Sequence, residues 1–207
     1  MTVQTNVLRV DLDTVGGNLV GADLLAYPVN KDQPETKVRL LDTNSAHFSV
    51  AQSGLLSMTG AAAPNHEAAF RTEDGASAYR LADGAQTLEV PLVWTDPATG
   101  LHVRKTFVFT RDSYEITQRL EIRNDGSEPW RGVAYEQLQR LPPPPASRTS
   151  GLTNPEAYSF QGAAWYSPVD KFEKFKPEAI FEDGAQTKAD VVGGWIAMLQ
   201  HHFAVAW

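Results

Sequence analysis

The side chains best suited to acid–base or metal chemistry in this sequence are its five histidines. Cysteine, another common metal ligand, is absent from the sequence. His47, His66 and His102 are isolated from one another along the chain. His201 and His202 are adjacent, so on a strand they would point to opposite faces and would not bind one metal ion together. The lack of cysteine also excludes thiol catalysis, disulfides and cysteine-ligated zinc. We expect no catalytic residue, no metal site and no bound cofactor.

Spacings that identify common enzyme classes are also missing. The sequence has no H-x-x-x-H pair, no G-x-S-x-G elbow, no P-loop and no G-x-G-x-x-G. Its glycine pairs, Gly16-Gly17 and Gly193-Gly194, are better explained as backbone turns than as phosphate cradles. We predict that the protein is not an enzyme.

An aromatic segment at residues 158–175, YSFQGAAWYSPVDKFEKF, is the stronger functional candidate. It interleaves aromatic residues with charged ones, the mixture of rigid anchors and adaptable charges that suits a protein interface. The residues predicted to bind a partner are Phe160, Trp165, Tyr166, Lys171, Phe172, Lys174 and Phe175. The alternative is an irregular flap whose aromatic side chains cap the core.

Three other aromatic residues, Trp94, Trp130 and Tyr135, are predicted to line a cleft for an extended apolar or carbohydrate ligand. Packing in the core is the alternative explanation for all three.

The composition limits the partners. The 207 residues are 42% hydrophobic and 21% charged, which is typical of a soluble globular protein. The net charge of -7 argues against nucleic acid or an anionic membrane surface as a partner. The N-terminus lacks the pattern of a signal peptide, so we expect any targeting segment to lie outside this sequence.

Short strands must position these candidates. Residues 88–94, 103–109 and 114–122 alternate apolar and polar side chains, with a hairpin loop predicted at 96–100 and a turn at 124–126. Residues 133–141 are predicted to be the fourth strand of this meander.

The N-terminal part also predicts a hairpin, because Leu8 to Leu12 alternates and Gly16-Gly17 can turn the chain into a second strand at 19–25. The proline run at 142–145 is predicted to be a surface loop, with a domain boundary as the alternative.

The most apolar stretch, residues 191–207, reads VVGGWIAMLQHHFAVAW. It is too interrupted to cross a membrane, which takes about 20 continuous apolar residues. We predict a buried strand, or two strands with an irregularity at the polar centre, and a helix over 195–202 is the alternative. The predicted fold class is mostly β and antiparallel, a sandwich or barrel.

Seven segments, in order along almost the whole chain, resemble the large periplasmic domain of the YidC family (YidC/Oxa/Alb) of bacterial membrane protein insertases. They are residues 10–17 (VDLDTVGG), 25–28 (LAYP), 51–55 (AQSGL), 105–109 (KTFVF), 160–164 (FQGAA), 171–175 (KFEKF) and 193–200 (GGWIAMLQ).

The resemblance implies an antiparallel β-supersandwich similar to the galactose mutarotase-like fold, with residues 1–207 as a single periplasmic domain. It places this domain between the first and second transmembrane helices of a Gram-negative inner-membrane protein. The family domain continues beyond the match, so the resemblance also implies a fragment truncated at the C-terminus. We expect an exposed edge at 191–207 and self-association through it.

For function, the resemblance implies a non-catalytic part of an insertase and chaperone. The parent assists Sec-dependent and Sec-independent insertion of inner-membrane proteins and meets nascent membrane proteins and the Sec translocon. Docking to SecD and SecF is associated with the proline-rich loop and the aromatic segment after it.

Two alternatives use the same fold differently. A carbohydrate-binding or mutarotase-like protein would need a histidine and a carboxylate that converge on a sugar. His102 with Glu121, and His201 with Glu136, are the pairs to consider. A periplasmic holdase would instead use an apolar groove lined by Trp94 or Trp130.

Overall fold

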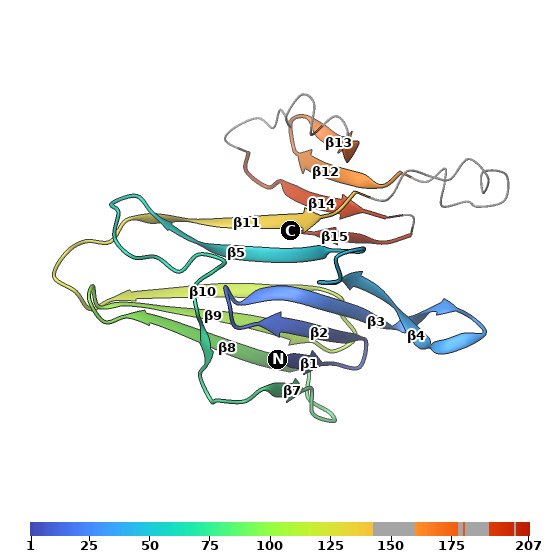
Figure 1. The fold of residues 1–207 in the computed structure, drawn as a ribbon, viewed down its shortest axis with the longest axis horizontal. Helices are drawn as coiled ribbons and strands as arrows, with labels where there is room; N and C mark the ends of the chain where they lie inside the picture. The colour runs from blue at the N-terminus through green and yellow to red at the C-terminus, as the bar shows by residue number, and fades with distance from the viewer. Residues whose placement is uncertain (143–159, 178–179, 181–190, 201) are drawn as a thin grey trace. The chain divides into compact units, whose positions relative to one another are not determined.

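The computed structural model describes residues 1–142, 160–177, 180, 191–200 and 202–207 and defines fifteen strands (Figure 1). With one exception, a parallel pair between β1 and β7, the paired strands are antiparallel in the registers that the structure defines. The predicted mostly β, antiparallel class is confirmed. A helix with the length and apolarity of a membrane span is absent from the described residues.

Contacts divide the chain into two compact units. The first comprises Met1–Asn44 and Ser49–Gln139, and the second comprises Ser45–Phe48 and Arg140–Trp207. The boundary after Gln139 is close to the proline run in the sequence. A single domain over residues 1–207, which the resemblance implies, stays a prediction.

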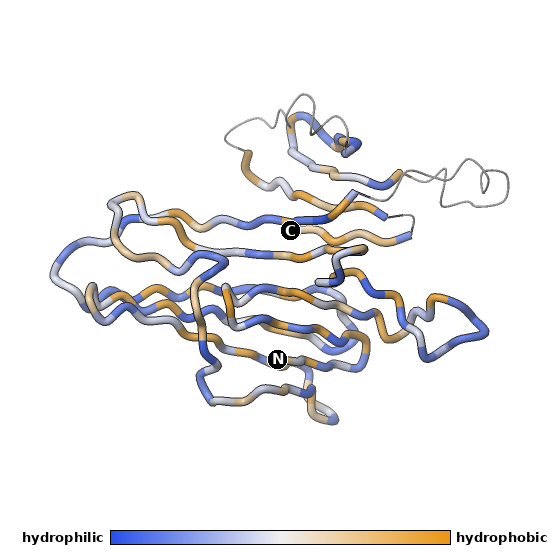
Figure 2. The backbone as a smooth tube through the Cα atoms, viewed as in Figure 1, coloured by the Kyte–Doolittle hydropathy of each residue, from blue (hydrophilic) through white to orange (hydrophobic). Residues whose placement is uncertain are grey.

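The first unit contains a seven-stranded sheet in the order β11-β5-β3-β2-β1-β7, with β4 paired to β3. Its strands are β1 (Thr2–Gln4), β2 (Leu8–Asp13), β3 (Asn18–Asn30), β4 (Gln33–Leu41), β5 (Ser49–Ser57), β7 (Ala78–Arg80) and β11 (Gly132–Arg140). The predicted hairpin between β2 and β3 is confirmed, and Gly16 and Gly17 turn it with φ values of 75° and 59°. Figure 2 shows the hydrophilic tip of the β3–β4 hairpin.

The second sheet of this unit has the order β10-β9-β8-β6. Its strands are β6 (Arg71–Thr72), β8 (Thr87–Asp96), β9 (Leu101–Thr110) and β10 (Ile116–Asn124). The predicted alternation is confirmed, because the apolar side chains on one face of β8 and β9 are buried. They are Val90, Leu92, Leu101, Val103, Phe107 and Phe109.

The strand predicted at residues 133–141 is confirmed as β11. Its predicted place as the fourth strand of this meander is wrong, because β11 pairs with β5 in the other sheet. The loop between β10 and β11 is hydrogen-bonded to the segment that follows β5. The Trp130 Nε1 donates to Ala62 O at 3.2 Å, and Met58 N donates to Arg131 O at 2.9 Å. A Cβ at Gly132 would lie 2.1 Å from the Trp130 ring, so only glycine lets the chain pass under the indole.

The second unit contains a four-stranded sheet in the order β13-β12-β14-β15. Its strands are β12 (Gly162–Ser167), β13 (Lys171–Phe175), β14 (Trp195–Leu199) and β15 (Ala204–Ala206). The apolar C-terminal stretch therefore forms two strands, as predicted, joined where Gln200 N donates to Phe203 O at 2.7 Å. The alternative helix over 195–202 is wrong, because Trp195–Leu199 pairs with β12 along its length.

Candidate functional site

A row of three aromatic side chains crosses the sheet of the second unit. Phe172 on β13, Tyr166 on β12 and Trp195 on β14 are direct neighbours in register, so their side chains share one face. The Tyr166 and Trp195 rings stack at 5.8 Å with an interplanar angle of 13°, and the Phe172 ring lies 5.8 Å from Trp195. Phe172 is 46% exposed and Trp195 is 37% exposed. We call these three residues the aromatic row.

A lysine completes this face. Lys174 lies opposite Ala164, which lies opposite Ala197, so its side chain is on the same side as the aromatic row. Its Nζ is 5.1 Å from the centre of the Phe160 ring and 5.5 Å from that of Phe172. These distances suit cation–π interactions. We call the aromatic row with Phe160 and Lys174 the aromatic face.

The other predicted partner-binding residues lie on the opposite face, because neighbouring side chains of a strand alternate. Trp165 is buried, and its Nε1 donates to Glu173 Oε2 at 3.1 Å. Lys171 donates from Nζ to Pro168 O at 2.8 Å. Phe175 is half-buried. The seven predicted residues therefore form two groups, one on each face of the sheet. The burial of Trp165 agrees with the alternative prediction, in which the aromatic side chains cap the core.

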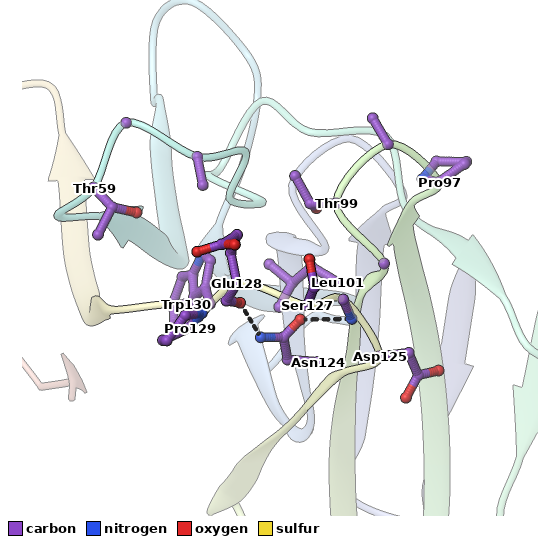
Figure 3. A pocket seen from close by; sticks show the side chains of 15 residues that line it. Thr59, Pro97, Thr99, Leu101, Asn124, Asp125, Ser127, Glu128, Pro129 and Trp130 are labelled. Carbon is purple, nitrogen blue, oxygen red and sulfur yellow. Dashed lines mark hydrogen bonds between the residues drawn. The ribbon is translucent and has the colours of Figure 1, made fainter.

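The first unit contains a pocket of about 790 Å³ between residues 59–61, 97–101 and 124–130 (Figure 3). Its walls are fixed by short-range bonds. Asn124 donates from Nδ2 to Glu128 O at 2.8 Å, and its Oδ1 accepts from Gly126 N at 3.0 Å. A Cβ at Gly126 would lie 2.2 Å from Thr99 O, so glycine allows the two loops to approach. A preformed pocket of this size can hold a small ligand.

Two of the three predicted cleft residues share one environment, and the third has a different one. Trp94 and Trp130 pack against the same buried cluster, made of Leu55, Leu101 and Val103. Tyr135 instead bonds to His66, with its hydroxyl 2.9 Å from His66 N and 2.5 Å from Nδ1. Trp130 belongs to the lining of the pocket in Figure 3, whereas Trp94 and Tyr135 do not.

Comparison with known proteins identifies the family. The family model described as the YidC periplasmic domain matches residues 1–207. The chain belongs to this family. It is therefore a periplasmic domain of a Gram-negative inner-membrane protein.

Two similar proteins show how much of a YidC protein is represented. The membrane protein insertase YidC of Xylella fastidiosa (strain M12) is 38% identical over 207 residues, which cover 100% of this chain and 36% of the relative. The membrane protein insertase YidC of Xanthomonas campestris pv. campestris (strain 8004) is 37% identical, with coverage of 100% and 34%. The chain thus spans about a third of the length of these curated relatives.

One of the segments that resemble YidC, residues 105–109, begins with a lysine that is completely buried. Lys105 on β9 has 0% exposure. Its Nζ donates to Gly16 O at 2.7 Å, to Ser53 O at 2.9 Å and to Ser53 Oγ at 3.0 Å. The Nζ also lies 5.1 Å from the centre of the Phe70 ring. Burial lowers the pKa of Lys105 to about 8.

The acceptors of Lys105 belong to the other sheet of the first unit, on β5 and on the turn before β3. Three acceptors match the three N–H groups of an ammonium. Ser53 Oγ in turn donates to Gln118 Oε1 on β10 at 2.7 Å. Lys105 is thus an internal tie between the two sheets of this YidC domain.

Among the described residues, the His102 and Glu121 side chains of the mutarotase-like alternative have separate partners. His102 Nε2 lies 3.3 Å from Asp125 Oδ2, while Glu121 Oε2 accepts from Arg104 Nη1 at 3.2 Å. His201 lies outside the described residues, so its pairing with Glu136 is not described. No group of three or more potential metal ligands occurs within the described part of the chain.

Sequence reasoning missed two residues of interest. The apolar pattern of residues 191–207 predicts a buried strand, but Trp195 is 37% exposed, and its place in the aromatic row depends on pairing with β12. Lys105 follows Arg104 in an alternating strand, and the apolar partners on its own face were the available signal that it points inward.

Proposed function

We propose that this chain is a non-catalytic docking module of a membrane protein insertase. Through its parent it assists insertion of nascent inner-membrane proteins, both with the Sec translocon and without it, and it binds the accessory proteins SecD and SecF. Membership of the YidC periplasmic domain family and the name of its relatives, membrane protein insertase, support the general role.

The observation that carries the docking role is the aromatic face. Large aromatic side chains at the centre of an interface supply much of its binding free energy, because they bury extensive apolar area with few rotatable bonds. Phe172 and Trp195 retain 46% and 37% exposure although each contacts another ring. The row is held by three paired strands, so its geometry is set before a partner arrives.

The test is binding of purified periplasmic domains of SecD and SecF to this chain, measured by isothermal titration calorimetry. Phe172→Ala and Trp195→Ala should each weaken binding by about tenfold or more, as expected of central aromatic anchors. Tyr114→Ala in the first unit is a matched control, because Tyr114 is an aromatic residue with 43% exposure. Unchanged binding of both aromatic variants would remove the aromatic face from the proposal.

Carbohydrate binding is the second candidate, and the pocket in Figure 3 supports it. Its lining combines an indole with the side chains of Ser127 and Glu128, for which no partner is seen among the described residues. Titration with neutral oligosaccharides, followed by NMR of the Trp130 indole N–H, would detect such a ligand. An unshifted signal at millimolar sugar would count against it.

Self-association is a further part of the proposal. β15 is the outer strand of the four-stranded sheet as described, and an edge strand presents backbone groups that can pair with another chain. Light scattering should show a mass that increases with protein concentration. A strict monomer at high concentration would contradict this.

A further inference from the structure

We infer that the segment that docks on the aromatic face is acidic and places a carboxylate on Lys174 while its apolar side chains cover the aromatic row. This inference rests on the proposed docking function and adds the chemical class of the partner. The two faces of the sheet formed by β12 to β15 differ in charge.

Lys174 is the one charged side chain that strands β12 to β15 present on the aromatic face. The register places only alanine, glycine, leucine and the aromatic row beside it, at 162, 164, 166, 172, 195, 197, 199, 204 and 206. The opposite face carries Lys171 and Glu173, and both have a hydrogen-bond partner within the chain. The two formal charges of that face are opposite in sign, so that face carries no net charge, whereas the aromatic face carries the single positive charge of Lys174.

Lys174 differs because its contacts are ring faces. Its Nζ lies near the rings of Phe160 and Phe172, and the structure pairs it with no carboxylate among the described residues. Rings hold an ammonium in place without accepting conventional hydrogen bonds from it, so its N–H donors stay available to a ligand.

The charge of the partner segment can be inferred from the free-energy cost of covering the Lys174 ammonium with each kind of side chain. A purely apolar segment would remove water from a charge and give it no acceptor, which is unfavourable. A basic segment would add like-charge repulsion. A carboxylate instead forms a charge-assisted hydrogen bond, strengthened where the rings and the partner exclude water. The aromatic row can meanwhile bury apolar side chains of the same segment.

The experiment measures affinity of this chain for the purified periplasmic domains of SecD and SecF. Lys174→Glu should weaken binding by about tenfold or more, and Lys174→Gln by less, because the neutral amide removes attraction without adding repulsion. Lys171 is left out of the docking proposal, because its side chain lies on the opposite face of the sheet. Lys171→Glu is therefore the matched control, since it makes the same charge change on the same strand away from the proposed docking surface. It should change affinity by about twofold at most.

The salt dependence of the affinity tests whether the effect of Lys174 is electrostatic. The difference between the original chain and Lys174→Glu should shrink as salt rises from about 50 mM to about 500 mM. A charge-reversing change of the contacting acidic residue in the partner should restore binding to Lys174→Glu. Circular dichroism should show the same β spectrum for all variants.

The outcomes distinguish this inference from the docking proposal beneath it. If Phe172→Ala and Trp195→Ala weaken binding but Lys174→Glu does not, the docking face stands and the acidic partner is overturned. Tighter binding of Lys174→Glu, or an equal loss with Lys171→Glu, overturns it as well. If none of these variants changes affinity, the docking face itself fails.

Discussion

Two lysines, one in each compact unit, show opposite uses of the same side chain. Lys105 is completely buried and donates three hydrogen bonds to acceptors in its own unit. Lys174 is exposed and touches the faces of Phe160 and Phe172. The N–H donors of Lys105 are used within the fold, whereas those of Lys174 are the donors that our proposal assigns to a partner. The comparison predicts that Lys105 controls stability and Lys174 controls binding.

The largest effect should come from Lys105→Ala. Loss of the long buried side chain costs about 2–5 kcal/mol, and acceptors left without a donor add about 1–3 kcal/mol. Removing the buried charge offsets about 3 kcal/mol of this, as the pKa shift indicates. We expect the free energy of unfolding to fall by about 3 kcal/mol in urea titrations. If Lys105→Ala is as stable as the original chain, the prediction that Lys105 controls stability is wrong.

The pH dependence of stability should show the same lysine titrating. Burial lowers the pKa of Lys105 from 10.5 to about 8 in the folded chain. Below pH 8 both states are protonated and the penalty of the buried charge is fully present. Between pH 8 and 10.5 the unfolded chain binds more protons, so stability rises, by up to about 3 kcal/mol.

This contribution is isolated by subtracting the profile of Lys105→Ala, measured by urea unfolding at a series of pH values. The difference should change across this interval and level off above it. A difference that stays constant from pH 7 to about 11 would mean that Lys105 does not titrate as its burial implies.

A smaller effect is expected for Ser53→Ala, which removes one acceptor of Lys105 and the donor to Gln118. We expect a loss of about 1–2 kcal/mol in the free energy of unfolding. Ser57→Ala is the matched control on the same strand, because its hydroxyl bonds only to Thr59 among the described contacts, at the exposed end of β5. If both variants lose the same free energy of unfolding, the hydrogen bond between Lys105 and Ser53 contributes no more to stability than the surface contact of Ser57.

The smallest effect on stability should come from Lys174→Ala. An exposed cation–π contact contributes about 0.5–1 kcal/mol at most, so thermal unfolding should shift only slightly. The same variant should weaken partner binding clearly. If Lys174→Ala strongly lowers the thermal stability, Lys174 has a structural role like that of Lys105, and the contrast between the two lysines is wrong.

Local patterns predicted a large part of this fold. Alternation in residues 88–94 and 103–109 identified the buried faces of β8 and β9, and Gly16-Gly17 identified the hairpin between β2 and β3. Both are confirmed because side-chain direction in a strand and turn conformation depend on near neighbours in sequence. The segments that resemble YidC likewise pointed to the family that the comparisons show.

Partners distant in sequence were decided by the tertiary structure. Alternation in residues 133–141 fits any neighbouring strand, and only the loop fixed by Trp130 and Gly132 directs β11 to β5. The composition of the aromatic segment likewise does not say which rings share a face.

The candidate site shows the same division. The sequence by itself determined that aromatic residues and lysines gather at 158–175. Pairing of β12 with β13 and β14 decided that Phe172, Tyr166 and Trp195 form one row, and that Trp165 turns away from it. The burial of Lys105 between two sheets was decided in the same way. Strand register joins residues far apart along the chain, and local alternation carries no information about that register.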